Sequence, residues 1–388
     1  MSLAEWIKQH GRALGFDRVG IAPATDFPEL ALFSEWKERG YAGELDYLAN
    51  PKRADVRELL PDPRSVICCA LVYDTNQPRS TEVPPHPGRG WISRYAWGDD
   101  YHSVLAGKLE VLRAALAERV GPGFEGKLYV DTGPVLERVY GKHAGLGWQG
   151  KNTCLLDNEL GSFFFLGVLV TNLELAPDTP LPDGCGSCTL CLEACPTGAI
   201  VEPYLLDARR CLSYLTIELR GPIPEEFRPA LGRHVFGCDI CQDVCPYNRR
   251  AWVADLAVFQ PRPVEIQEPN SGRQPAPSGS EGRVPSDSEG SLFHPRLDWL
   301  ASLTEKDFRR VFQTSAVKRA KWRGLLRNVL VAMGNSGNRR FRPLLEKFAA
   351  SDDSLLAEHA RWGLTRLAEV DTRQGPLPAE ARRSEAGR

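Results

Sequence analysis

The fold is decided by CGSCTLCLEACP at residues 185–196, a lone Cys211 in RRCLSYL, and CDICQDVCP at residues 238–246. These eight cysteines form two sets of four, and each tight run ends in a cysteine directly before a proline. Thiolates are the ligands of iron–sulfur clusters, and this spacing is typical of bacterial ferredoxins that carry two 4Fe–4S clusters. In that pattern the cysteine before the proline binds the other cluster.

The crossover predicts the ligands of each cluster. We expect cluster 1 to be held by Cys185, Cys188, Cys191 and Cys245, and cluster 2 by Cys195, Cys211, Cys238 and Cys241. Cys211 lies far before its partners, so a loop must return it to the site. Zinc prefers two separated cysteine pairs and leaves the cysteines before proline unexplained. Disulfides need an oxidising compartment, for which the sequence gives no sign.

The composition is that of an ordinary globular protein. The chain has 388 residues, of which 42% are hydrophobic and 25% charged, which indicates two or three domains. The first residues contain no apolar signal core or twin arginine, so we expect a cytoplasmic protein. Of the three other cysteines, Cys68 and Cys69 lie in the apolar run SVICCALVY and are expected to be buried, while Cys154 has no assigned role.

Charge is unevenly distributed along the chain. Residues 304–388 contain 18 lysines and arginines against 10 aspartates and glutamates, although the whole chain has a net charge of −2. This excess indicates an anionic partner near the C-terminal end, with nucleic acid as one candidate. A solvated helix face is an equally good explanation of the charge pattern alone.

The N-terminal part, residues 1–175, is predicted to be an α+β domain with a mixed or antiparallel sheet. We expect strands at RVGIAPA, SVICCALVY and GKLYVD, and helices near residues 3–14, 31–39 and 101–120. A turn at Asp131–Pro134 should lead into a helix with Pro134 in its first turn, and a second turn at Asp157–Gly161 should close a hairpin. Residues 75–102 are rich in proline and glycine and are expected to loop over a site. The sequence has no dinucleotide or Walker motif.

The rest of the chain divides by composition. The cluster domain is expected at residues 176–261 and a linker at 262–291, within which Gln267–Gly290 is rich in Pro, Ser, Gly and Glu and is predicted to be disordered. Helices near residues 322–333, 341–350 and 355–370 resemble HEAT-like repeats, so residues 292–375 form a helical region. Residues 376–388 are expected to be a frayed tail.

Several long blocks together resemble the epoxyqueuosine reductase family. They are LYVDTGPVLERVYGKHAGLGWQGKN at 128–152, GSFFFLGVLVTN at 161–172, the cysteine runs and ARRCLSYLTIELRG at 208–221. The resemblance implies reduction of epoxyqueuosine to queuosine at the tRNA wobble position, the last step of queuosine biosynthesis. It also implies base-off cobalamin between the N-terminal and ferredoxin-like domains, near cluster 2, with electrons supplied by an unidentified reductant protein. We expect a monomer.

The resemblance also assigns site residues. Asp131, in the family's VD(T/S) motif, is the implied general acid, and we expect its pKa to be raised by burial; by itself it is a good turn or helix-entry residue. Each position implied to contact the corrin has an ordinary structural alternative. These positions are Arg53, Ser93 or Arg94, Asp131, Leu155, Leu166, Ser213, Cys238 and Asp239. His143 is not expected to bind cobalt, because the family uses no protein ligand there.

The basic C-terminal segment supplies the predicted tRNA contacts. They are Lys318, Arg319, Lys321, Arg323, Arg327, Arg339, Arg340 and Arg342. An anticodon loop presents an unstacked wobble base, so no duplex has to be opened. Trp91, Tyr95 and Trp97 are candidates either for stacking on bases or for simple packing.

Three other functions are compatible with some of these features. A reductive dehalogenase shares the cofactor set, but typically has a twin-arginine signal and no basic helical tail. A two-cluster electron-transfer protein leaves the N-terminal domain without a role. A tRNA-binding module with structural clusters predicts RNA affinity without turnover.

Overall fold

The N-terminal domain is built on a four-stranded sheet. In the computed structural model, which describes residues 1–53, 55–254, 256–264 and 290–374, the strand order is β1 (Arg18–Pro23), β2 (Ser65–Val72), β7 (Phe164–Thr171) and β4 (Gly126–Tyr129). Every neighbouring pair is antiparallel. The antiparallel alternative is therefore confirmed and the mixed sheet is wrong, because each strand enters from the end of the sheet opposite to its neighbour.

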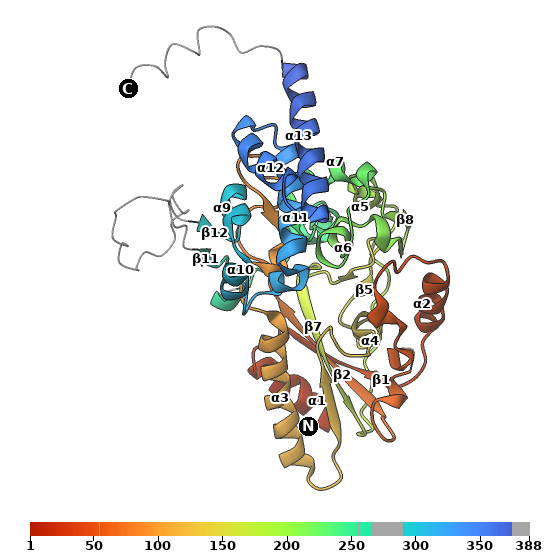
Figure 1. The fold of residues 1–388 in the computed structure, drawn as a ribbon. Coiled ribbons are helices and arrows are strands. Elements are labelled where there is room, and N and C mark those ends of the chain that lie inside the picture. The colour runs from red at the N-terminus through yellow and green to blue at the C-terminus, as the bar shows by residue number, and fades with distance from the viewer. Residues whose placement is uncertain (54, 255, 265–289, 375–388) are drawn as a thin grey trace.

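Helices cover both faces of this sheet (Figure 1). Helices α1 (Leu3–Ala13) and α3 (Tyr101–Val120) pack on one face, and α4 (Glu137–His143) packs on the other. Because side chains alternate along a strand, Cys69 of β2 faces the first core and Cys68 faces the second. Both cysteines are fully buried, as predicted. The remaining N-terminal helix, α2 (Pro28–Glu38), lies to one side of the domain.

Two local predictions differ from the structure. Helix α4 begins at Glu137, so Pro134 lies in the preceding turn and not in the helix. The expected hairpin is wrong in its pairing, because β6 (Leu155–Leu156) pairs with β5 (Trp148–Gln149) while β7 pairs with β2 and β4. A bridge between Asp157 and Gly161 does close the predicted turn, but the two strands then diverge.

The cluster segment is made of short elements joined by loops. Its helices are α5 (Leu190–Ala194), α6 (Leu212–Ile217), α7 (Arg228–Leu231) and α8 (Ile240–Asp243), and its strands are β8 (Ile200–Glu202), β9 (Leu205–Leu206) and β10 (His234–Phe236). Strand β10 pairs in parallel with β3 (Trp91–Ile92), which lies in the Pro/Gly-rich loop of the N-terminal domain. This pairing ties the loop directly to the cluster segment.

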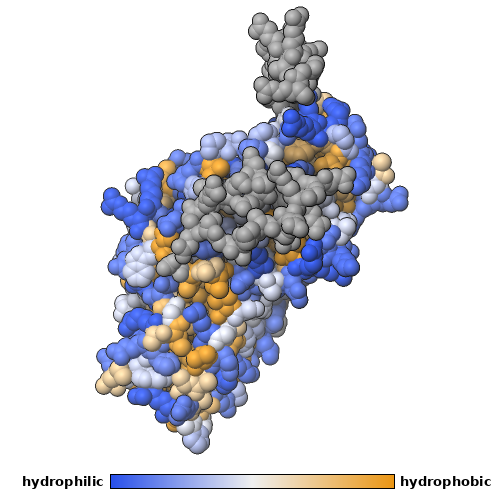
Figure 2. Space-filling view, turned by 90° about the vertical axis from the view of Figure 1, so that its left-hand side faces the viewer, coloured by the Kyte–Doolittle hydropathy of each residue, from blue (hydrophilic) through white to orange (hydrophobic). Residues whose placement is uncertain are grey.

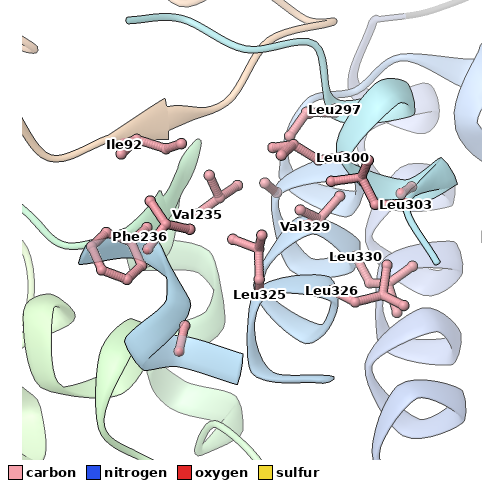
Figure 3. Packing of buried hydrophobic residues seen from close by; sticks show 14 of the residues in the cluster. Ile92, Val235, Phe236, Leu297, Leu300, Leu303, Leu325, Leu326, Val329 and Leu330 are labelled. Atoms are coloured by element: carbon pink, nitrogen blue, oxygen red, sulfur yellow. The ribbon is translucent and has the colours of Figure 1, made fainter. Parts of the chain in front are cut away.

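The C-terminal region is helical, as predicted. It contains α9 (Leu297–Ser302), α10 (Glu305–Val311), α11 (Lys321–Asn335), α12 (Arg342–Ala349) and α13 (Ser354–Gln374). Figure 3 shows α11 between two partners: Leu325 points toward Val235 and Phe236 of β10, and Leu330 lies on the side of α9. One apolar cluster therefore joins the helical region to the cluster segment, which stabilises their relative placement.

The predicted disordered segment Gln267–Gly290 lies outside the described residues, except for Gly290. That residue belongs to β12 (Gly290–Ser291), which pairs with β11 (Pro263–Val264). The predicted tail at residues 376–388 is also outside them. On the face in Figure 2, hydrophobic residues form separate patches among hydrophilic ones. Among the described residues, no helix is both long enough and apolar enough to span a bilayer.

Candidate active site

Asp131 lies two residues after the edge strand β4, in a strained turn. Its φ angle is 56°, in the left-handed region that non-glycine residues rarely adopt. Gly133 completes the turn, since a Cβ there would lie 2.3 Å from the ring of Tyr129. The Asp131 side chain is 65% exposed, so the turn presents its carboxylate to open space.

The first turn of α3 supplies the partners of this carboxylate. The Tyr101 hydroxyl donates to Asp131 Oδ2 at 2.7 Å, and His102 Nε2 lies 3.4 Å from the same oxygen. The other ring nitrogen of His102 is 2.6 Å from Asp100 Oδ1. Asp100 caps α3 and forms an ion pair with Lys318 at 2.6 Å. A connected polar network thus links Asp131 to the C-terminal helical region.

Electrostatics in this network contradict one prediction. The surrounding protein displaces part of the water around Asp131 and raises its pKa, but the His102 ring at 3.4 Å and the hydrogen bond from Tyr101 outweigh this effect, so the net pKa lies below the usual value. The expected raised pKa is therefore wrong for the structure as it stands. Burial lowers the pKa of His102, but Asp100 and Asp131 more than compensate and raise it to about 9. At neutral pH the proton is held on His102, between two carboxylates.

A second carboxyl group lies close to Asp131. Burial and the charge of Asp131 raise the pKa of Glu137 to about 7. Its Oε1 atom is buried and has no hydrogen-bond partner. A buried polar oxygen normally has a partner, so an amide-rich cofactor placed beside Asp131 would satisfy this atom. This observation fits a cobalamin, whose periphery carries amide side chains.

The thiols predicted for cluster 1 lie together. Cys245 and Cys185 share a small apolar cluster with Trp148 and Leu156. Burial, Cys185 and Cys191 raise the pKa of Cys245 to about 11, and burial, Cys185 and Cys188 raise that of Cys191. These mutual effects connect the four thiols of the first predicted set.

The thiols predicted for cluster 2 form a second group. Burial raises the pKa of Cys238 well above its usual value, and Cys211 and Cys195 raise it further. A hydrogen bond to Cys154, burial, Cys238 and Cys211 raise the pKa of Cys241. The amide of Ala199 donates to Cys195 Sγ at 3.2 Å, which favours a thiolate.

The donor set fits clusters better than a single ion. Within the described ranges, no three His, Cys, Asp or Glu side chains converge closely enough to hold one metal ion. A cubane does not require such convergence, because each of its four thiolates binds a different iron.

Ser93 and Arg94 support the loop of cluster 2. The Ser93 hydroxyl and the Arg94 amide both donate to the buried carboxylate of Asp239, which follows Cys238. Gly237 precedes that cysteine, and a Cβ there would lie 2.4 Å from Ser93, so only glycine fits. The Arg94 guanidinium is committed elsewhere, since it is 1% exposed and donates to Thr75, Gln77 and Pro78.

The other positions implied to contact the corrin are spread over four elements. Leu155 and Leu166 lie together beneath Gly141 of α4, where a Cβ would meet both side chains. Arg53 is buried, donates to the carbonyl of Val135 at 3.4 Å and packs over a tyrosine ring. Ser213 lies in the first turn of α6, two residues after Cys211.

The basic residues predicted to bind tRNA do not form one class. Arg327 is fully buried and donates to the carbonyls of Leu215, Leu219 and Gly221, so its prediction as a phosphate contact is wrong. The guanidinium instead supplies donors to the end of α6 and the loop behind it. The other seven predicted contacts are exposed: Lys318, Arg319, Lys321, Arg323, Arg339, Arg340 and Arg342.

Some of the exposed cations have protein partners. Arg319 forms a bidentate pair with Glu218, and Arg323 does so with Asp353. Arg319 also lies over the ring of Tyr47, which brings a cation near the Asp131 network. Exposed ion pairs are weak, so a phosphate can compete for these side chains.

The aromatic candidates for base stacking are packing residues. Trp91 is 1% exposed and Trp97 is fully buried, and both pack against Phe293. Tyr95 is partly buried against the same core. His143 stacks on Phe27 and lies 3.2 Å from Glu29.

Sequence reasoning missed Tyr101, His102, Glu137 and the place of Cys154. The Cys154 thiol lies against Cys241, at the edge of the second cysteine set. The motif GDDYH did carry a signal, because Asp99 and Asp100 directly precede an amphipathic helix. Nothing in the linear order, however, shows that the first turn of α3 meets the end of β4.

Comparison with known proteins agrees with this arrangement. Residues 53–132 match a family described as epoxyqueuosine reductase QueG, DUF1730, and residues 184–248 match a 4Fe-4S double cluster binding domain. An epoxyqueuosine reductase from Gloeobacter violaceus is 43% identical over 86% of this chain and 97% of its own length. One from Salmonella typhimurium is 38% identical over 95% and 89%, respectively.

Solved structures extend the likeness to three dimensions. A crystal structure of epoxyqueuosine reductase with a tRNA-Tyr epoxyqueuosine-modified stem loop has a TM-score of 0.79 and 28% identity, and the match covers 98% of this chain and 96% of the other. The Bacillus subtilis enzyme, with its catalytic aspartate loop swung out of the active site, has a TM-score of 0.76 at 28% identity over 98% and 96%. On these grounds the chain belongs to the epoxyqueuosine reductase family, a family of oxidoreductases, and contains the family's double 4Fe–4S domain.

Proposed function

We propose that Asp131 delivers a proton in the reaction of this family, the reduction of epoxyqueuosine in tRNA to queuosine, and that electrons pass through both clusters to base-off cobalamin. The observation that carries the proposal is the position of the Asp131 carboxylate. It is exposed at the end of β4, yet bound by Tyr101 and His102 in a strained turn. Strained residues with defined polar partners are typical of active sites.

Bound cobalamin supplies the two electrons that remove the epoxide oxygen. The chain would hold it between the Asp131 turn and the cluster 2 loops, where Ser213 and the Glu137 carboxyl group would be available to the cofactor and the buried Asp239 carboxylate would fix the loop beside Cys238. Leu155 and Leu166 provide an apolar surface beneath α4. Three of the implied positions act through other residues. The Arg53 guanidinium donates to the Val135 carbonyl, and Ser93 and Arg94 both donate to the Asp239 carboxylate.

Proton transfer is the part of the reaction that side chains perform. Opening an epoxide places negative charge on its oxygen, and a nearby acid stabilises that charge by donating a proton. The fixed turn holds Asp131 Oδ2 in one orientation toward the open space. Its hydrogen bond from Tyr101 is compatible with either charge state, because a hydroxyl can donate or accept.

The exposed cations near this network suit a tRNA substrate. Lys318 and Arg319 lie in the 3-10 turn Ala316–Ala320, close to Asp100 and the Asp131 network. The solved relative with an epoxyqueuosine-modified stem loop supports the choice of substrate. The HEAT-like helical region presents the other phosphate contacts. We infer a cytoplasmic monomer that receives electrons from a separate reductant protein.

The experiment is anaerobic turnover of epoxyqueuosine-containing tRNA by the reconstituted protein with cobalamin and a strong reductant. Mass spectrometry of the digested nucleosides reads loss of one oxygen. Asp131→Asn is nearly isosteric and should abolish queuosine formation while cobalamin still binds. Unchanged turnover by this variant contradicts the role of Asp131. Cobalamin binding without any reaction of the tRNA by wild-type protein would instead favour a dehalogenase-like activity, and failure to bind cobalamin would favour an electron carrier.

A further inference from the structure

The proposed reaction needs two protons. An epoxide that accepts two electrons becomes an alkene only if its oxygen leaves as water, which consumes two protons. A single carboxyl group carries one. The low pKa of Asp131 also means that this carboxyl group is ionised at neutral pH unless another group loads it. The Asp131 site therefore requires a neighbouring proton store.

His102 occupies the position that such a store requires. It is the second residue of α3, and its ring bridges two carboxylates, with Nδ1 2.6 Å from Asp100 Oδ1 and Nε2 3.4 Å from Asp131 Oδ2. The Nε2 atom is buried and makes no hydrogen bond within normal limits. Nε2 and Asp131 Oδ2 are therefore close but not hydrogen-bonded, and proton transfer requires the two side chains to approach further.

A purely structural role explains this histidine poorly. A cation in the first turn of a helix opposes the helix dipole, which favours acidic residues there. Asp100 already caps α3 by accepting from the His102 amide at 3.1 Å, so the cap does not need the imidazole. The ring instead connects the cap to Asp131.

The groups that face His102 all come from known elements. Asp100 and Tyr101 belong to the start of α3, with the Tyr101 ring stacked on the imidazole at 4.1 Å, and Asp131 comes from the turn after β4. Lys318 lies behind Asp100, and Glu137 and Arg138 lie behind Asp131. Two carboxylates in direct contact outweigh the more distant cations, and the pKa of His102 is about 9.

We propose that His102 stores a proton for the reduction and returns it to Asp131 during each turnover. The His102 Nε2–H proton moves to the Asp131 carboxylate, and Asp131 gives it to the epoxide oxygen as the C–O bond breaks. Neutral His102 then takes a second proton from solvent while Asp100 holds its ring in place. This proton follows the same path through Asp131, and the oxygen leaves as water. This role rests on the proposed function of Asp131.

The first test measures protonation directly and does not depend on activity. In NMR titrations of protein with ¹⁵N-labelled histidine, His102 should titrate near pH 9. Asp131→Asn and Asp100→Asn should each move the titration toward the ordinary histidine value near 6.5. Titration of wild-type His102 near 6.5 would overturn the proposal, because the ring would then be largely neutral at physiological pH.

The second test is the pH dependence of single-turnover reduction by pre-reduced enzyme. The wild-type rate should fall about tenfold per pH unit above about pH 9. His102→Gln should react about 100-fold more slowly than wild type at pH 7, and its rate should not show this fall at high pH. His10→Gln is the matched control, since that ring stacks on Trp6 far from the site, and it should keep the wild-type profile.

The outcomes separate the two proposals. A wild-type rate and pH profile in His102→Gln would overturn the proton store alone and leave Asp131 as the acid. No reduction by wild-type protein would overturn the proposed function, and the catalytic use of His102 with it. Rescue of a His102→Ala variant by added imidazole would support the store, because a merely structural defect does not respond to a diffusible base.

Discussion

The two cysteine sets differ in how the protein holds them. Three ligands of the first set fall within one tight run, Cys185–Cys191, and a short apolar cluster brings Cys245 to them. The second set is gathered from separate loops. Cys211 and Cys238 pack into an apolar cluster that includes Val331 of α11, which lies in the distant helical region.

This difference has a physical origin. Residues within a tight run lose little chain entropy when they gather around a cluster, whereas distant segments must be held by other contacts. Here α11 supplies those contacts. The Asn328 amide donates to the carbonyls of Thr216 and Val235, both at 2.8 Å, which fixes the segments after Cys211 and before Cys238. Among the described residues, the C-terminal helices contribute to the apolar cluster around the second set, and no residue of these helices belongs to the cluster around the first.

The largest expected effect comes from removing one ligand of each set. Cys238→Ser and Cys188→Ser should each abolish turnover and remove about half of the iron, because each cluster needs four thiolates. Electron paramagnetic resonance of the reduced proteins should show a different surviving cluster in each variant. Loss of both clusters in Cys188→Ser would contradict the claim that the two sets are held independently, since the second set would then depend on the first.

Next in size is the loss of the buried guanidinium on α11. Arg327→Met leaves three carbonyls without their donor, and relief of the buried charge offsets only part of this cost, so we expect about 3 kcal/mol of destabilisation. Anaerobic denaturant unfolding measures it, and the cluster 2 signal should weaken first. The control Arg323→Met, which removes an exposed ion pair on the same helix, should cost less than about 1 kcal/mol. Equal costs would contradict the assignment of Arg327 as a support.

A smaller effect is expected from the brace on Asp239. Ser93→Ala removes a hydroxyl that donates to this buried carboxylate and should cost about 1–2 kcal/mol. It should also shift the reduction potential of cluster 2, as measured by redox titration, because the loop beside Cys238 moves. Thr189→Ala removes an exposed hydroxyl contact with Glu193 beside the first set and should leave both quantities nearly unchanged. If Ser93→Ala shifts the reduction potential of cluster 1 alone, the assignment of the Asp239 brace to cluster 2 is wrong.

The smallest effect concerns the exposed cations of the helical region. Arg340→Ala should weaken tRNA binding modestly and reduce the slope of log affinity against log salt by about one. Arg327, on the neighbouring helix, makes no such contribution because it is buried. Fluorescence anisotropy with a labelled stem loop at several salt concentrations measures the slope. An unchanged slope in Arg340→Ala would place the RNA on another surface.

Local patterns predicted several parts of the molecule well. The helix expected at 101–120 is α3, residue for residue, and the three C-terminal helices lie where apolar periodicity placed them. The fully buried Cys68 and Cys69 follow from the alternation of a strand covered on both faces. Each of these features depends on neighbours within one or two turns, which a sequence pattern records directly.

Other predictions failed where distant segments decide the outcome. Arg327 looked like a phosphate contact among basic neighbours, but α6 and the loop after it offer it three carbonyls. The pKa of Asp131 is lowered and not raised, because the first turn of α3 brings His102 to it. The strand at Leu155 pairs with β5 instead of β7, since β2 and β4 already occupy both edges of β7.

The sequence by itself determined the chemistry available to this protein: eight cysteines in a two-cluster pattern, an aspartate in a turn after a strand, and a basic C-terminal region. These follow from residue types and short spacings, which do not depend on the rest of the fold. Only the tertiary structure decided which groups act together. It placed His102 between Asp100 and Asp131, buried Arg327, and made α11 a support for the second cysteine set. Long-range packing sets burial and charge neighbours, and these in turn set protonation and partner choice.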